Sequence, residues 1–465
     1  MPTQNEAPPL ATTAPVPAAP APLRLGRVAA QALGGSDVQP AKLARRLALG
    51  SVRLLICTLL VSAALERVRP QSHVDLYPGY VAAHFANEGR WERIYHRSIW
   101  LHNGLDREWD QRVSKLTLQP VLGTSFVYHP FYLQFLRPIA ARWTYHDFQQ
   151  AWIKLNHVSV AAVGMAIAAL LGQRTLAAQV LVSLSVGAAA PTIDSVQHGQ
   201  NGLPALALAL AAAACWRSRA PLWAGGLFLA LAWSCKPWCA ALLGLCFALR
   251  GLRAGIVTSL AVGFAMGVLP KLIMPAGLMH DYQELTVAMT SASVSGHNNI
   301  SILSTLERLI QPDWAKHLSE WIPRVAELKL RLTALGLASA VFALGALLWW
   351  WRKPSARYTS VVFLAFCIMP LGICWTHYFV FALPLALLCS FDARSPYALR
   401  AVGLGLLLVL LDLLNIVFVT PELQAVYAVA PPAFPWSQAL PMIMLGLTCL
   451  CAMALAPREQ SSRVG

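Results

Sequence analysis

Charged residues are scarce in this 465-residue chain. They make up 12% of it, whereas a soluble domain carries about 25%. Hydrophobic residues reach 57%, and the mean hydropathy is +0.54. This composition excludes a soluble globular fold. It predicts an all-α polytopic membrane protein, because helices satisfy their backbone hydrogen bonds inside lipid.

The sequence also lacks the patterns of several other function classes. No glycine-rich phosphate loop, Rossmann pattern or internal repeat is visible. The net charge of +15 does not form a basic stripe interleaved with aromatics, so nucleic acid is not expected as a partner. The ten cysteines lie almost wholly in apolar runs, which predicts packing residues rather than disulfides or zinc ligands. No metal and no cofactor are expected.

Twelve apolar segments follow an N-terminus that is not apolar. Residues 1–46 are rich in alanine and proline and then basic, and we expect them to form a disordered cytoplasmic N-terminus. The apolar segments predict a transmembrane domain over residues 47–456 with about 12 helices, and a cytoplasmic tail at 457–465. The segments are 47–67, 150–171, 175–191, 202–215, 221–234, 238–250, 254–275, 332–351, 359–374, 377–391, 399–419 and 437–456.

The charges between these segments predict their orientation. With the N-terminus in the cytoplasm, every inner loop carries Arg or Lys, as the positive-inside rule requires. The rule holds only if the short piece Phe126–Ala141 does not cross, so we expect this piece to lie on the outer face, amphipathic or re-entrant. Two large outer loops are then predicted at about 68–149 and 276–331. The inner loops are 173–174, 216–220, 250–253, 352–357 and 392–400.

Lys236 stands alone in the uncharged stretch from Pro221 to Leu249. A Lys in hydrocarbon costs at least about 2.5–3.5 kcal/mol, which makes it a functional candidate. Pro237 follows it and predicts two short helices that meet at a break near the outer membrane edge. Two interpretations stay open. Lys236 is either a ligand for a phosphate group or an anchor whose side chain snorkels to the interface.

Other polar residues are predicted on the same face, each with a structural alternative. Asp75 has the chemistry of a general base, and its alternative is a solvated loop residue or a helix cap. His129 and His377 suit a phosphate group, but turn packing is the alternative for His129. A structural role is the alternative for His377, which has no acid near it in the sequence. Gln200 and Asn201 are candidates for binding sugar hydroxyls or for capping a helix.

The order of these motifs resembles that of glycosyltransferase family 87, the polyprenol-phosphate-dependent mannosyltransferases with the GT-C fold. The resemblance spans roughly residues 48–456. The element at 198–201 has one residue fewer than the family pattern, and the element at 296–301 carries an insertion. The matching motifs are Asp75-Leu76-Tyr77 with Gly89-Arg90-Trp91, Tyr128-His129-Pro130, His198-Gly199-Gln200-Asn201, Ser234-Cys235-Lys236-Pro237, Gly296 with Asn299-Ile300-Ser301, and Trp375-Thr376-His377-Tyr378.

The resemblance implies an enzyme that transfers a hexose from a polyprenyl-phosphate donor to a lipid or glycan acceptor. Mannose is the expected sugar, and the configuration at its anomeric carbon is inverted. Asp75 would be the general base. Lys236, His377 and His129 would bind the donor phosphate. The enzyme would be a multi-pass protein among the lipids of the inner (plasma) membrane, with a metal-free active site facing the periplasm or exterior. Further substrate contacts would come from Tyr77, Tyr128, Gln200, Asn201, Asn299 and Trp375.

Two other functions stay open at this point. A transporter or flippase of a lipid-linked glycan would place charges along a central pathway and often shows inverted repeats. The polar residues here crowd one face instead. A GT-C arabinosyltransferase with another donor would have the same composition.

Overall fold

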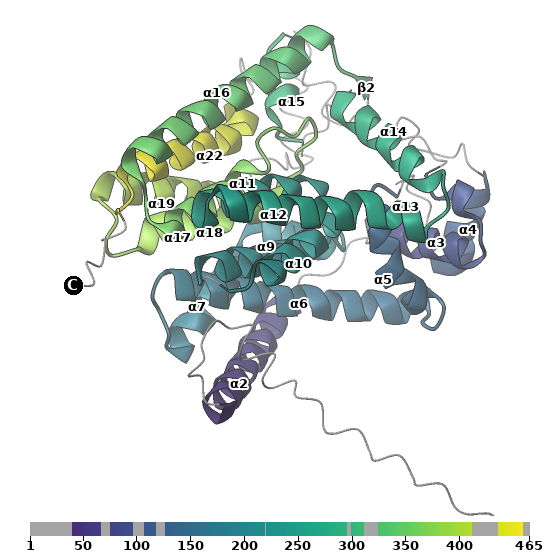
Figure 1. The fold of residues 1–465 in the computed structure, drawn as a ribbon, viewed down its shortest axis with the longest axis horizontal. Coiled ribbons are helices and arrows are strands. Elements are labelled where there is room, and N and C mark those ends of the chain that lie inside the picture. The colour runs from purple at the N-terminus through teal and green to yellow at the C-terminus, as the bar shows by residue number, and fades with distance from the viewer. Residues whose placement is uncertain are drawn as a thin grey trace, which may run out of the picture.

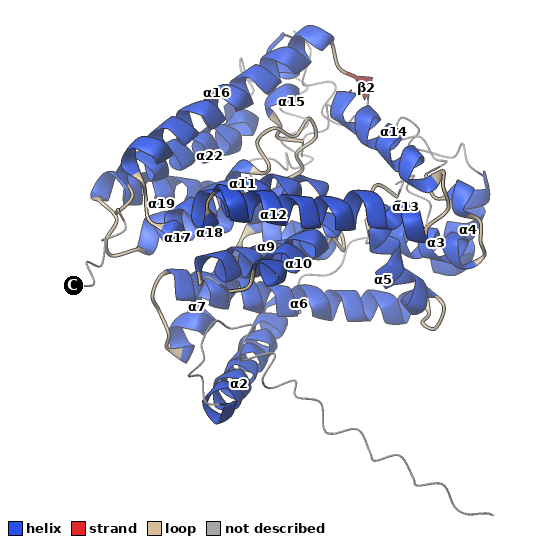
Figure 2. Ribbon diagram, viewed as in Figure 1, coloured by secondary structure: helices blue, strands red, loops and turns tan. Residues whose placement is uncertain are grey.

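The computed structural model describes residues 40–66, 75–95, 107–117, 126–218, 220–294, 299–310, 324–411 and 436–458. The described chain is mostly helical (Figure 2). Its strands are the two-residue pieces β1 (Ala292–Ser293) and β2 (Arg324–Val325), which pair antiparallel. The expectation of an all-α protein is confirmed.

Each of the twelve predicted apolar segments contains a helix. In chain order these helices are α2 (Pro40–Leu65), α6 (Tyr145–Leu170), α7 (Leu176–Ala188) with α8 (Ala190–Gln197), α9 (Gly202–Arg217), α10 (Leu222–Cys235), η2 (Pro237–Leu242) with α11 (Leu243–Arg250), α12 (Leu252–Gly263) with η3 (Phe264–Val268) and α13 (Leu269–Ile273), α16 (Leu328–Arg352), α17 (Ala356–Phe366), η5 (Thr376–Ala382) with α18 (Leu383–Phe391), α19 (Tyr397–Leu411) and α22 (Trp436–Leu455).

Four of these helices are long and apolar enough to cross a membrane, and the bent pair α7–α8 is a candidate for a fifth span. The bend between α7 and α8 is 68°. Seven further apolar helices have 10–17 residues, below the ~20 of an ideal span. The four long ones are Ala44–Leu65, Tyr145–Leu170, Leu252–Ile273 and Leu328–Arg352. The chain is therefore a helical membrane protein, and the number of spans beyond these stays a prediction.

The predicted outer loops form short helices at one end of the molecule. α3 (Tyr77–Asn87), η1 (Trp91–Arg93), α4 (Arg107–Thr117) and α5 (Pro130–Ala140) belong to the first loop, and α14 (Leu278–Ser291) and α15 (Ile302–Ile310) to the second. α3 packs against both α4 and α5, at the right of Figure 1. α5 has 11 residues and lies within the piece Phe126–Ala141, which agrees with a segment too short to span.

The predicted inner loops meet one another at the opposite end. Arg53 donates a hydrogen bond to the carbonyl of Arg174 (2.9 Å), and Arg250 donates to that of Ala220 (2.9 Å). The guanidinium of Arg357 donates to the carbonyl of Leu170 at the end of α6 (2.5 Å). The bond of Arg250 joins two of the predicted inner loops, and that of Arg357 joins a third to the end of α6, whose last carbonyls have no intrahelical donor.

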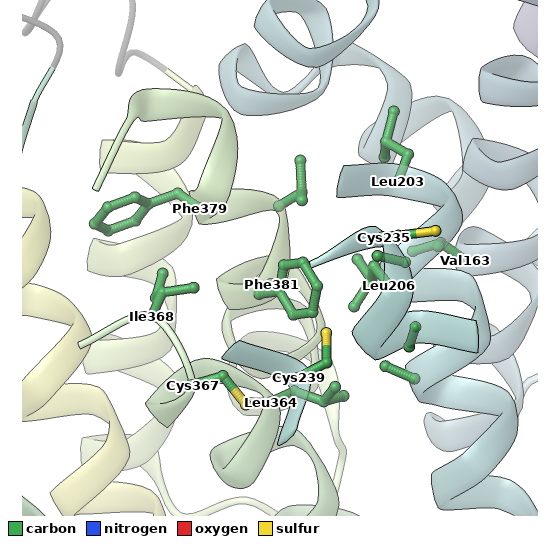
Figure 3. Packing of buried hydrophobic residues seen from close by; sticks show 14 of the residues in the cluster. Val163, Leu203, Leu206, Cys235, Cys239, Leu364, Cys367, Ile368, Phe379 and Phe381 are labelled. Atoms are coloured by element: carbon green, nitrogen blue, oxygen red, sulfur yellow. The ribbon is translucent and has the colours of Figure 1, made fainter. Parts of the chain in front are cut away.

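The chain breaks at Lys236 as predicted. α10 ends at Cys235, Lys236 has an extended backbone (φ −138°, ψ 105°), and η2 begins at Pro237. Proline has no N–H to continue the helix, and it disfavours helical geometry in the residue before it. The same break directs η2 into the core, where Cys239 and Cys367 lie near Phe381 (Figure 3). All ten cysteines are free thiols, in agreement with the expected packing role.

Candidate active site

The turn that follows α8 connects the parts of the site. His198 and Gln200 donate backbone hydrogen bonds to Asp194 (3.1 Å) and Ser195 (2.9 Å), which closes the helix end. Gly199 has φ +68°, a left-handed conformation that a side chain would disfavour. The turn therefore reverses the chain at Gly199 and places Gln200 and Asn201 at the start of α9.

Three distant segments bind to this turn. The amide of Asp75 donates to the carbonyl of His198 (3.3 Å), and the indole of Trp152 donates to that of Gly199 (2.9 Å). Lys236 Nζ donates to Gln200 Oε1 (2.8 Å). The Asn201 amide donates to the carbonyl of Cys235 at the end of α10 (2.9 Å). The structure therefore brings Asp75, Lys236 and the 198–201 element together.

Asn201 does not act as the expected helix cap. It occupies the N-cap position of α9, but its side chain makes no capping hydrogen bond. The amide is instead used across the break to hold the last carbonyl of α10. The capping alternative for Asn201 is thus wrong, because its side chain is oriented toward the open carbonyl at the end of α10.

Lys236 is enclosed by aromatic rings. Its Nζ lies 4.8 Å from the ring centroid of Tyr378, 5.1 Å from that of Trp238 and 5.8 Å from that of Tyr128. The residue is 3% exposed. Ring faces stabilise a cation at these distances, more strongly when water is excluded. The side chain thus points into protein rather than past the end of its helix, which favours ligand binding over snorkelling.

His377 meets an acid that is remote in the sequence. Its Nδ1 lies 3.4 Å from Asp194 Oδ2, and His198 Nδ1 lies 2.9 Å from Asp194 Oδ1. Asp194 is 1% exposed. The absence of an acid around His377 in the sequence is thus misleading, since packing of η5 against α8 supplies one. Burial acts to lower the pKa of His198, but the hydrogen bond and charge of Asp194 outweigh it and raise the pKa to about 9.

Asp75 lines a small cavity. The cavity has a volume of about 10 Å³, room for roughly one water molecule. Asp75 is half-buried, and the Tyr128 hydroxyl donates to its backbone carbonyl (3.3 Å). The N-cap of α3 is Leu76, so Asp75 does not cap that helix. Its carboxylate acts electrostatically on His198, Lys236 and His377. The cavity is lined by Asp75, Leu76, Gly79, Tyr128, Tyr132, Leu136, Phe148, Trp152, Gly199 and Asn201.

The side chain of His129 contacts residues close to it in the chain and in the second outer loop. Its Nδ1 accepts a hydrogen bond from the amide of Phe131 (3.2 Å) and so caps α5. The ring packs edge-on against Tyr282, with centroids 5.0 Å apart. Burial lowers the pKa of His129 to about 4, so the ring is neutral at pH 7. In this geometry His129 adds no positive charge to the site.

Asn299 joins the second outer loop to the segment before His377. Its Oδ1 accepts from the amides of Cys374 (2.8 Å) and Ser301 (3.3 Å), and its Nδ2 donates to the carbonyl of Val294 (2.9 Å). Asn299 is fully buried and also forms a β-bridge with Trp375. The side chain therefore fixes the backbone that leads to His377. Tyr77, another expected substrate contact, is fully buried in α3.

A model of glycosyltransferase family 87 matches residues 126–373, more than half of the chain. The chain belongs to glycosyltransferase family 87. No curated protein and no solved structure matches it. The family assignment confirms the resemblance and makes the protein a glycosyltransferase that acts on a sugar donor and an acceptor. It favours the enzyme over the transporter alternative.

The matched region of this family 87 chain contains only part of the site. Lys236, Gln200 and Asp194 lie inside it, whereas Asp75 lies before it and His377 after it. Hydrogen bonds and ion pairs to the α8 turn bring both outlying residues to the matched region.

Sequence reasoning gave no role to Asp194, although its spacing to His198 was visible. Residues four apart lie on one face of a helix, and Asp194 and His198 have this spacing. The two rings of Tyr378 and Trp238 beside Lys236 had no comparable signal, because they come from different elements, η5 and η2. Within the described ranges, the one group of three side chains spaced for a metal is His280, Asp281 and Glu284 on α14. It lies on the protein surface, where such groups are common without an ion.

Proposed function

We propose that this family 87 enzyme transfers a hexose, with mannose as the expected sugar, from a polyprenyl-phosphate donor to a hydroxyl of a lipid or glycan. The observation that carries the proposal is the buried ammonium of Lys236 beside Gln200, within electrostatic reach of Asp75. A buried cation is costly unless an anion or a dipole compensates it. A phosphate that bridges lipid and sugar supplies that anion at the place where the sugar must react.

Asp75 takes the role of general base in this mechanism. Its carboxylate removes the proton from the acceptor hydroxyl while the oxygen attacks the anomeric carbon of the donor sugar. The bond between that carbon and the phosphate oxygen breaks, and the electron pair leaves with the polyprenyl phosphate. Attack from the face opposite the leaving group inverts the anomeric configuration.

Lys236 and His377 bind the leaving phosphate. Charge-assisted hydrogen bonds to a developing anion are stronger in a dry site than in water. Gln200 orients Lys236 through the hydrogen bond of 2.8 Å, and the rings of Tyr128 and Tyr378 limit its motion. For His129 we propose a positioning role at the start of α5 rather than a charge, since its ring is neutral.

The substrate contacts divide by their surroundings. Tyr128 and Asn201 line the cavity beside Asp75 and are proposed to contact the sugar. Trp375 and Gln200 are proposed to border the donor phosphate. Asn299 and Tyr77 are proposed to position the site without touching the substrate. Asn299 holds the backbone before Trp375, and Tyr77 packs within α3. The 10 Å³ cavity is too small for a sugar, so donor binding requires the walls to move apart.

For the architecture we propose the GT-C fold with about 12 spans in the inner (plasma) membrane. Both termini lie inside, and the site faces the periplasm or exterior. The separation of the charged loops from the site residues at opposite ends of α6 supports this orientation. The site residue Trp152 and the Arg357 partner Leu170 are 18 positions apart in α6. That spacing corresponds to about 27 Å along the helix.

Turnover with defined donors tests the function. The purified enzyme in nanodiscs is given polyprenyl-phosphate mannose, polyprenyl-phosphate glucose and a polyprenyl-phosphate arabinose, with membrane lipids or glycans as acceptors. Release of polyprenyl phosphate with a new α-hexoside supports the proposal. Turnover with the arabinose donor alone, or with soluble sugar nucleotides alone, overturns it. Labelling of Asp75→Cys by an impermeant maleimide in whole cells tests the orientation.

A further inference from the structure

A second cavity, the α16 groove, lies between α16 and the pair α11 and α12. α16 follows the edge of the molecule (Figure 1) and contributes Phe342, Gly345, Ala346 and Trp349 to the lining. The other lining residues belong to α11, the start of α12, α17 and α22, and all of them are apolar. The volume is about 370 Å³, within the range of ligand cavities. The groove shares no lining residue with the cavity beside Asp75.

The groove opens toward the membrane. Leu252 and Ala346 line it and are exposed on the surface of the protein. They belong to Leu252–Ile273 and Leu328–Arg352, two of the helices that are long and apolar enough to cross a bilayer. An apolar space of this kind does not retain water, and lipid hydrocarbon surrounds it. The chain of a lipid is therefore the occupant that its lining fits.

One end of the groove reaches two basic loops. Leu252 and Trp349 line the groove next to the loops 250–253 and 352–357. These two loops contain five Arg or Lys and no Asp or Glu. Asp392 is the one acid in the predicted inner loops, and its carboxylate already accepts hydrogen bonds from an arginine and a tyrosine. Positive charge at this end therefore exceeds the negative charge of the described residues.

Arg352 continues the lining of the groove. It follows Trp349 by three residues and Gly345 by seven, so the three share one face of α16. Its Nε is buried and has no hydrogen-bond partner in the described part of the chain. Its Cζ lies 5.7 Å from the ring centroid of Trp351, and a ring on one side of a guanidinium leaves the N–H groups at its rim free. A phosphate oxygen is a suitable partner for these donors.

The loop after α16 is held in place without a ligand. Lys353 has φ +49° and donates its amide to the carbonyl of Trp349 (2.8 Å), and the amide of Ser355 donates to the carbonyl of Pro457 (3.0 Å). Glycine is the usual residue in a left-handed position at a helix end. Lys353 is exposed and adds a positive charge there instead. The basic end of the groove is thus preformed.

We propose that the α16 groove is a binding site for an anionic phospholipid. One acyl chain lies in the groove, and the phosphate binds Arg352, with Arg253 and Lys353 as further positive charges near it. Basic residues beside apolar helices attract anionic headgroups. The donor lipid is a poorer fit, because Lys236 and the lining residue Ala248 are separated by η2 and most of α11, about 20 Å along the axis. One phosphate cannot bind at both ends.

Lipid binding without a sugar substrate tests this site separately from the proposed function. The purified full-length protein in detergent is titrated with phosphatidylglycerol or with phosphatidylcholine of the same acyl chains, and bound lipid is counted by native mass spectrometry. Phosphatidylglycerol is expected to occupy one site at least tenfold more tightly than phosphatidylcholine, because only its headgroup has a net negative charge. Equal affinities overturn the proposal.

Two variants with matched controls locate the bound lipid. Ala346→Phe fills the groove and should abolish the tight site, whereas Ala343→Phe, at an exposed position of α16 outside the lining, should retain it. Arg352→Gln should bind both lipids alike, whereas Arg331→Gln, at the other end of α16, should keep the preference. Arg352→Gln keeps the stem of the side chain, so it tests the headgroup even if a filled groove prevents folding. Wild-type preference in Arg352→Gln contradicts the proposal.

Competition with polyprenyl monophosphate separates the two possible lipids. An excess of polyprenyl monophosphate is expected to leave phosphatidylglycerol bound to the wild type. Displacement of phosphatidylglycerol that is lost in Ala346→Phe would assign the groove to the prenyl chain of the donor and overturn the proposal. Absence of sugar transfer by the wild type would count against the proposed function and leave the lipid result standing.

Discussion

Two buried aspartates lie at opposite ends of this protein, and they have different partners. Asp392 accepts hydrogen bonds from Arg357 (3.2 Å), the Tyr358 hydroxyl (3.2 Å) and the amide of Arg394 (3.2 Å). Arg357 in turn donates to the carbonyl of Leu170. Asp194 instead pairs with two histidines.

The difference lies in what the partners can do next. A guanidinium stays charged at any physiological pH. The guanidinium of Arg357 binds Asp392 and also donates to the carbonyl at the end of α6, so this cluster is structural. Imidazoles change their charge near neutral pH and keep a second nitrogen. That nitrogen is unpartnered in His377, among the residues that the structure describes. The two aspartates are alike in burial and charge, and they differ in what their partners can bind.

The largest effect is expected from Asp75→Asn. Loss of the general base should lower kcat by about 10²–10⁴-fold, the usual contribution of acid–base catalysis. The thermal unfolding temperature should change little, because the carboxylate is half-buried and its backbone makes the structural contacts. Steady-state sugar transfer and thermal unfolding are measured on the same preparation. Wild-type turnover would remove Asp75 from the mechanism.

Lys236→Met should weaken binding of the donor but not of the acceptor. Methionine fills the aromatic cage but cannot bind phosphate, and a hydrogen bond to a charged group contributes about 1.5–3 kcal/mol. We expect the KM for the donor to rise roughly 10–150-fold, with the KM for the acceptor nearly unchanged. Lys154→Met, at an exposed position of α6, is the control. An equal rise of both KM values would instead indicate a general packing role.

Asp392→Asn should do the opposite of Asp75→Asn. The charge of Arg357 loses its compensation, and the free energy of unfolding should fall by about 1.5–3 kcal/mol. The kcat of the folded fraction should stay near the wild-type value. Chemical denaturation and turnover are the two measurements. A large loss of kcat at full folding would mean that the two ends of the molecule are coupled, and the comparison above would fail.

The smallest effect concerns pH and His198. Because folding raises its pKa from about 6.5 to about 9, its stabilising contribution is fully present below pH 6.5 and is lost as pH rises toward 9. The unfolding temperature of the wild type should therefore fall over this range, and that of His198→Gln should fall less. His146→Gln, at an exposed position, should behave as wild type. Parallel curves for wild type and His198→Gln would contradict protonation of His198.

Much of the fold could be predicted because its signals are local. Apolar runs place the helices, and Pro237 places the break beside Lys236. The Arg-bearing loops predict which helix ends lie together, as the bonds of Arg250 and Arg357 agree. Helix ends that fall inside a longer apolar run were harder to predict. The bend of 68° between α7 and α8, for example, falls within a single predicted segment.

The sequence predicted which residues come together at the site better than it predicted their contacts. Asp75, Lys236 and Gln200 were expected on one face and do meet at the α8 turn. The use of the Asn201 amide on Cys235 was not foreseen, because the competing carbonyl belongs to another helix. The neutral state of His129 follows from burial and capping, which are also consequences of packing.

Local patterns are sufficient to predict a helical membrane protein, the places of its helices and the break at Lys236. Each of these follows from hydropathy, charge or proline within a short window of residues. The contact of Asp194 with His377 and the three rings around Lys236 become visible only in the packed fold. These contacts join elements far apart in the chain. Their geometry depends on how whole helices pack, and no local pattern of residues encodes it.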